Sequence, residues 1–162
     1  MKPHPIALLS LLLSLYIYLV YRTDATNINQ ILNTESIQTI QIIRTQSMPL
    51  PSWIIYSLPE GLWLFATTLY SKKLYFDWNK HKISLVYFPI LFAFTVEFFQ
   101  ATHITNGSFD LMDLLVSLFC WSIALILPTP YSSLNVFKQY HYRTIIVIFC
   151  YAIVYLSDVT NI

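Results

Sequence analysis

Four polar side chains that could do chemistry lie close together in a strongly apolar part of the sequence. The stretch VEFFQATHITNGSFDLMDLL, residues 96–115, contains Glu97, Gln100, Asp110 and Asp113. Residues three apart share one face of a helix, so each successive pair should point in one direction. Paired carboxylates can transfer protons, bind an amine or a hydroxyl group, or hold a divalent ion through oxygen ligands.

The segment between the two pairs should bring them together. It contains Asn106-Gly107, a strong turn signal, and helices joined by a short turn pack as antiparallel neighbours. Glu60 follows Pro59 in an earlier apolar segment and is expected to approach from a third helix. We therefore predict a polar ligand-binding pocket, to which His103 in the turn is added as a further candidate. Its members are Glu60, Glu97, Gln100, His103, Asp110 and Asp113.

Several of these residues also have a purely structural explanation. Asp110 could be the N-cap of the helix that follows, with Asp113 in its first turn, where the helix dipole favours both. Gln100 could end the preceding helix, and His103 could be a solvated turn residue. Pro59 could open a short helix, but we favour a longer helix kinked at Pro59.

Composition sets the expected class of protein. Of 162 residues, 56% are hydrophobic and only 10% are charged, against about 25% charged in soluble domains. The mean hydropathy is +0.57. The sequence therefore predicts an all-α integral membrane helical bundle in one domain, residues 1–162, in the plasma membrane. The net charge of +1 argues against a nucleic-acid partner and leaves the lipid bilayer as the expected one.

Apolar segments predict about five transmembrane helices. They cover residues 6–21, 50–70, 83–100, 111–127 and 144–156. With the N-terminus inside, basic residues favour the inner side, which fits the positive-inside rule. The inner side would hold Lys2, Lys72, Lys73, Lys80, Lys82, Lys138 and Arg143, and the outer side Arg22 and Arg44.

The first segment and the polar stretch behind it leave alternatives open. The first segment could be a cleaved signal peptide, although an uncleaved anchor is favoured because no clean cleavage site follows it. Residues 22–49 are predicted to form an extracytoplasmic loop containing either a short strand or an amphipathic helix. Cys120 and Cys150 lie in apolar runs without metal-binding spacing, so no metal and no cofactor is predicted.

The acidic motif resembles the VanZ-like family of small bacterial membrane proteins. The resemblance rests on Glu97-Phe98-Phe99-Gln100, Gly107-Ser108-Phe109-Asp110 and Asp113, and covers roughly residues 58–125. Family members carry an Arg in the turn, where this chain has Gly107-Ser108. The resemblance implies a multi-pass architecture in the cell envelope and no particular reaction.

Three classes of function follow from these observations. The first is a non-enzymatic protein that binds or modulates a cell-envelope ligand through the acidic pocket in the outer leaflet. The second is a structural or accessory subunit with a membrane-protein partner. The third, a membrane enzyme acting on a lipid-linked precursor, is less favoured because the sequence has no G-x-S-x-G, H-E-x-x-H or P-loop motif.

Overall fold

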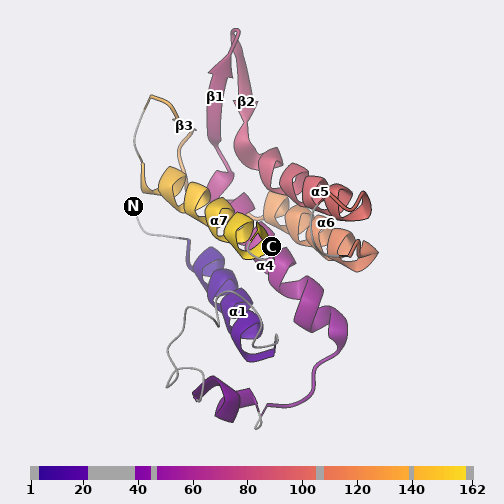
Figure 1. Ribbon diagram of the computed structural model, residues 1–162. Helices are drawn as coiled ribbons and strands as arrows, with labels where there is room; N and C mark the ends of the chain where they lie inside the picture. Colours follow the sequence, from indigo (N-terminus) through magenta and orange to yellow (C-terminus); the bar gives the residue numbers. More distant parts are fainter. Residues whose placement is uncertain (1–3, 22–38, 45–46, 105–107, 139–140, 160–162) are drawn as a thin grey trace.

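The structure is a computed structural model that describes residues 4–21, 39–44, 47–104, 108–138 and 141–159. Helices dominate it, and a small sheet projects from one end (Figure 1). The longer helices are α1 (Pro5–Tyr21), α4 (Ser52–Ser71), α5 (Phe88–Ala101), α6 (Leu111–Ile126) and α7 (Tyr142–Val159). The remaining elements are β1 (Leu74–Trp78), β2 (His81–Ser84), the 3-10 turn η1 (Leu85–Tyr87) and β3 (Leu134–Asn135), and residues 39–44 are helical.

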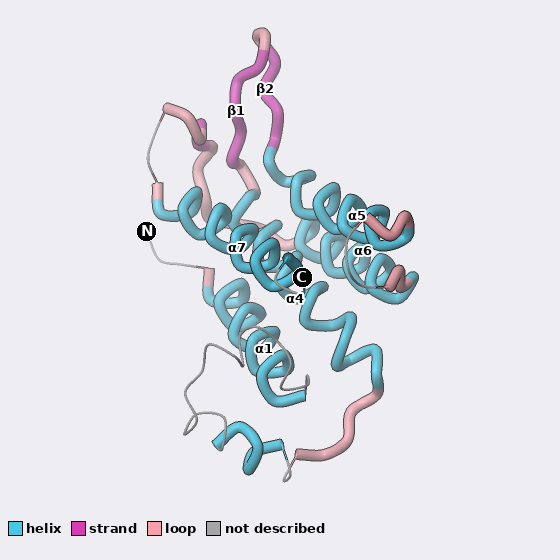
Figure 2. The backbone as a smooth tube through the Cα atoms, in the orientation of Figure 1, coloured by secondary structure: helices cyan, strands magenta, loops and turns pink. Residues whose placement is uncertain are grey.

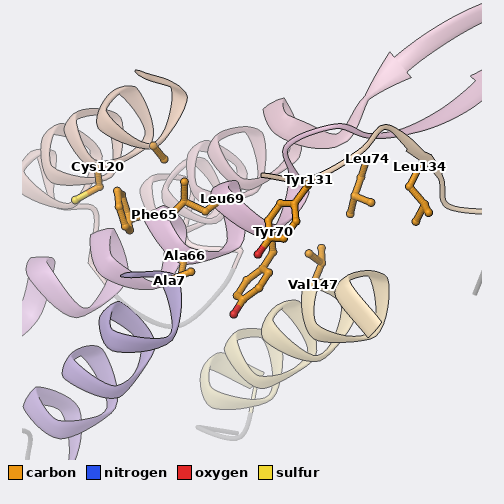
Figure 3. Close-up of a cluster of buried hydrophobic side chains, with 11 residues drawn as sticks. Ala7, Phe65, Ala66, Leu69, Tyr70, Leu74, Cys120, Tyr131, Leu134 and Val147 are labelled. Carbon is orange, nitrogen blue, oxygen red and sulfur yellow. The ribbon is translucent and has the colours of Figure 1, made fainter. Parts of the chain in front are cut away.

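Helix α4 is the centre of the fold. It contacts α1, α5, α6 and α7, and every residue from Trp63 to Ser71 is buried. A helix that is surrounded on all sides must be apolar around its whole circumference, which the sequence LWLFATTLY provides. Figure 3 shows Phe65, Ala66 and Leu69 of α4 in the main cluster of buried side chains, with Val147 contributed by α7.

Helix α4 contains Pro59 and Gly61 near its middle, and each of them contacts a neighbouring helix. Gly61 lies directly against α6, where an added Cβ would be 2.6 Å from Val116 Cγ1 and 3.0 Å from Cys120 Sγ. The helix continues through Pro59, whose carbonyl oxygen accepts a 2.7 Å hydrogen bond from Ser14 Oγ of α1. The small residue therefore lets α4 and α6 approach closely.

Three basic side chains donate hydrogen bonds to carbonyl groups at the C-terminal ends of helices. Lys72 Nζ donates to Ala124, Leu125 and Leu127 at the end of α6. The guanidinium of Arg143, which is 1% exposed, donates to the carbonyls of Tyr70 and Lys72 at the end of α4. Arg44 likewise donates to Leu19 and Val20 at the end of α1. Each cation supplies donors that the last turn of a helix lacks and complements the helix dipole.

The sheet contradicts the predicted all-α fold. Its strand order is β2-β1-β3, with β1 and β2 antiparallel and β3 parallel to β1. Asn79 and Lys80 join β1 to β2 with φ of 45° and 71°, the backbone region used by two-residue hairpin turns. The sequence LYFDW is rich in aromatic residues suited to a strand. The predicted topology leaves residues 71–82 as an inner segment between two transmembrane helices, and the strands correct that prediction.

The predicted transmembrane architecture is also corrected. Among the described residues, no helix combines the length and the apolar character that crossing a bilayer requires. Helix α5 has 14 residues, so it measures about 21 Å against a hydrocarbon core about 30 Å thick. Helix α4 has 20 residues, but Pro59, Glu60 and several hydroxyl side chains lower its mean hydropathy. The predicted multi-pass bundle and its plasma-membrane location both required transmembrane helices, and the described part of the chain contains no helix that meets the requirement.

The close contact at Gly61 yields a stability prediction. Gly61→Ala should destabilise the fold by about 1–3 kcal/mol, because Val116 is β-branched and its side chain cannot rotate away easily. The better helix propensity of alanine, about 1 kcal/mol, offsets part of this cost. Urea unfolding measures the change.

The partner variant Val116→Ala is the control for a steric cause. Since it removes the nearest atom, Gly61→Ala and Val116→Ala together should be more stable than the sum of the single effects by about 1 kcal/mol. Strict additivity would show that the cost of Gly61→Ala does not come from this contact.

A second prediction concerns Tyr131, which packs on the ring of Tyr70 and lies 4.0 Å from the guanidinium of Arg143. Burial, assisted by Tyr142 and Tyr70, raises the pKa of Tyr131 to about 12, although Arg143 opposes the shift. The native phenol therefore stays protonated where the unfolded chain, with a pKa near 10, ionises. Its contribution to stability is complete below about pH 10 and is lost as the pH rises towards about 12.

Unfolding free energies of the wild type and Tyr131→Phe, measured across this pH range, test the assignment. The wild type should lose up to roughly 3 kcal/mol more than the variant, which cannot ionise at this position. Parallel decline of both proteins would contradict it.

Candidate functional site

Three carboxylates from three helices meet in the structure. Glu60 of α4, Glu97 of α5 and Asp113 of α6 each place an oxygen within 4.8 Å of the others. We call these three residues the acidic cluster. Glu97 is buried, with 2% exposure, while Glu60 and Asp113 are half-buried. A small ligand could therefore approach from the side of the two half-buried residues.

The helix ends position two of the three carboxylates. Glu97 lies in the last turns of α5, and its Oε2 accepts a 3.1 Å hydrogen bond from the backbone N–H of Asp110. Asp113 lies in the first turn of α6. The exposed N–H groups and the dipole at the start of α6 favour negative charge at both positions. This explains in part how an otherwise apolar bundle accommodates the cluster.

The packing of α4 on α6 positions the third carboxylate. The two helices run in the same direction, since Gly61 lies against Val116 and Cys120 while Lys72 reaches the end of α6. Glu60 precedes Gly61 by one residue and Asp113 precedes Val116 by three, so both carboxylates lie where the two helices approach closely.

Two buried hydroxyl groups accompany the carboxylates. Ser57 lies three residues before Glu60 in α4, and Ser117 lies four residues after Asp113 in α6, so each shares a helix face with its acid. Their exposures are 1% and 0%, and among the described residues neither Oγ has a hydrogen-bond partner. Buried hydroxyls normally have partners, so these two oxygens are unused polar groups on the helix faces that carry Glu60 and Asp113.

The other candidate residues have different positions. Asp110 is exposed and is the N-cap of α6, accepting a 2.8 Å hydrogen bond from the N–H of Met112, as the structural alternative had it. His103 is exposed just beyond the end of α5, with φ of 56°. Gln100 is half-buried in the last turn of α5. The predicted turn at Asn106-Gly107 lies outside the described residues.

The sequence pattern identified the three carboxylates but not the hydroxyl group of Ser57. Ser57 has no role assigned from the sequence. Its signal was available, because Ser57, Glu60 and Gly61 share one helix face. What the sequence lacked was evidence that this face is covered by α6 and not exposed.

Comparison with known proteins adds no functional assignment. No protein-family model, curated protein or solved structure matches this chain. The resemblance to the VanZ-like family therefore receives no support, and the site must be interpreted from its own geometry.

The geometry of the acidic cluster predicts the effect of removing one charge. In a metal chelator, Glu60→Gln should stabilise the protein by about 1 kcal/mol, because it relieves repulsion among three carboxylates. Two unit charges about 5 Å apart interact by roughly 3 kcal/mol at an effective dielectric constant of about 20, and partial exposure reduces this value.

Asp77→Asn is the matched control, since Asp77 accepts hydrogen bonds from Asn135 and Lys138 in the sheet. This substitution should leave stability unchanged or lower it slightly. Equal loss of stability in Glu60→Gln and Asp77→Asn would argue against net repulsion in the cluster.

Proposed function

We propose that this protein is a non-catalytic cation-binding protein whose acidic cluster holds a divalent metal ion, with Ca²⁺ as the best fit. The observation that carries the proposal is the convergence of Glu60, Glu97 and Asp113, with ligand oxygens within 4.8 Å of one another. Carboxylate oxygens are the ligands that hard divalent cations prefer. A bound cation would also neutralise charge that three neighbouring acids otherwise concentrate in one place.

The irregular set of ligands favours calcium over magnesium. Ca²⁺ binds oxygens at about 2.3–2.6 Å, so two ligands on opposite sides of the ion are roughly 4.6–5.2 Å apart. For Mg²⁺ at about 2.0–2.1 Å, the same separation is roughly 4.0–4.2 Å. Oxygens that all lie within 4.8 Å of one another could meet either ion, but calcium tolerates irregular coordination, whereas magnesium demands near-ideal octahedral geometry.

The unused hydroxyl groups give independent support for a ligand. Ser57 and Ser117 lie on the helix faces that carry Glu60 and Asp113, and both Oγ atoms are buried without described partners. Each could bind a cation directly or through a water molecule. Such ligands raise the number of oxygens towards the six to eight that calcium takes.

The catalytic alternative has less support. General acid–base or nucleophilic chemistry requires a reactive group beside the substrate, and the three acids are accompanied here by hydroxyls without a base in hydrogen-bond contact. The sequence predicted a cell-envelope ligand for the acidic pocket, and we now propose a metal cation as that ligand. An organic amine is the alternative ligand. An ammonium group would be distinguished by binding without any metal.

Calcium titration of chelator-treated protein tests the proposal. A ligand that binds only the folded state stabilises it by about 2.7 kcal/mol at 100 times its dissociation constant, so unfolding in urea should shift clearly with Ca²⁺. Mg²⁺ at the same concentration should shift it less. Isothermal titration should give one site per chain.

Variants locate the site. Glu60→Gln and Asp113→Asn should each weaken Ca²⁺ binding at least about tenfold, while Asp77→Asn and the N-cap variant Asp110→Asn should bind like the wild type. Because Glu60 and Asp113 are half-buried, these substitutions test the site even if the buried variant Glu97→Gln folds poorly. Absence of any calcium effect in the folded wild type would refute the proposal.

A further inference from the structure

A second surface, beyond the C-terminal end of α4, has the opposite charge. All the exposed lysines of the described chain lie on the sheet or directly beside it: Lys73, Lys80, Lys82 and Lys138. We call these four residues the lysine face. The one acidic residue in this region, Asp77, already accepts hydrogen bonds from Lys138 and Asn135. The lysine face is therefore strongly positive although the whole chain carries only +1.

Exposed aromatic side chains lie on the same hairpin and beside it, with Trp78 on the face opposite Lys82, because Trp78 pairs with His81 and Lys82 pairs with Asp77. Trp78, at the end of β1, is 64% exposed, and Phe137, just after β3, is 82% exposed. Tyr75 lies beneath Lys82, whose Nζ is 5.1 Å from the ring centroid. Figure 2 shows that β1 and β2 project beyond the helices, so the tip of the hairpin can reach a surface before the rest of the molecule does.

The shape and composition of the hairpin narrow the class of partner. A stable protein interface usually buries about 800 Å² on each side, which a narrow projecting hairpin does not offer. Strand addition to the free edge of β2 is also disfavoured, because this edge strand has only four residues and Lys82 lies within it. Lysines combined with an exposed tryptophan are instead typical of contact with lipid headgroups, where the ring occupies the interface and the ammonium groups meet phosphates.

We infer that the lysine face, with Trp78, is a docking surface for anionic phospholipid headgroups. The contact is peripheral and requires no segment to cross the bilayer. Lys80 lies in the hairpin turn and Lys82 follows it in β2, so both approach the phosphates first, while Trp78 enters the headgroup layer from the other face of the hairpin. This inference is independent of the acidic cluster, which lies beside the middle of α4.

Sedimentation with lipid vesicles tests this docking surface. The protein should bind vesicles containing phosphatidylglycerol and not vesicles of phosphatidylcholine alone, and added salt should weaken binding. Each lysine near an anionic surface contributes about fivefold in binding, so Lys80→Ser with Lys82→Ser should weaken it roughly 25-fold. Trp78→Ala should weaken binding to anionic vesicles as well.

Matched controls separate local from general effects. Ser52→Glu with Thr95→Glu changes the net charge by the same amount at exposed positions in the helices, and should bind nearly as the wild type does. Trp53→Ala removes a 44% exposed tryptophan at the start of α4 and should have little effect. Equal binding to both kinds of vesicle, or equal losses in the lysine and control variants, would overturn the inference. Binding to polyglutamate or to single-stranded DNA without binding to anionic vesicles would also overturn it.

Discussion

The rest of this fold depends on the hydrogen bonds that basic side chains donate to the C-terminal ends of helices. Because α4 is enclosed by other helices, its last carbonyl groups are removed from water and need donors from the protein. Arg143, from the start of α7, supplies them, and Lys72 does the same for α6. Burial lowers the pKa of both cations, yet the carbonyl groups around them hold the charged side chains in place. These contacts fix where α7 begins relative to the end of α4, and place β1 directly after Lys72.

The same helix polarity explains why the acids gather at the other end. Helices α4 and α6 run in one direction, so the end that offers N–H groups to Glu97 and Asp113 is remote from the end that binds Lys72. Apolar packing between these ends, centred on Gly61 and Trp63, keeps the two charged regions apart. Trp63 adds a further link, since its Nε1 donates a 3.1 Å hydrogen bond to the carbonyl of Cys150 in α7. The bundle thus has an apolar centre and an oppositely charged region near each end.

Local patterns in the sequence located the helices and the acidic residues, but not their surroundings. The apolar segments lie close to α1, α4, α5, α6 and α7, because helical periodicity and length are local properties. The spacing of Glu97 and Asp113 around a short turn indicated their approach for the same reason. The sheet was missed because β3 pairs with β1 across about sixty residues, and composition alone was taken to mean transmembrane helices. The buried state of Ser57 and of Arg143 depends on which helices cover them, which no local pattern reveals.

The separation of charge along α4 also gives the molecule a direction. Glu60 and Lys73 are thirteen residues apart, which corresponds to about 20 Å along a helix. Opposite charges held this far apart form a permanent electric dipole, and an external field exerts a torque on it. Near any extended negative boundary, the protein would rotate during its diffusional approach until the hairpin leads. The acidic end would then face away from that boundary, towards the solution from which a metal ion arrives.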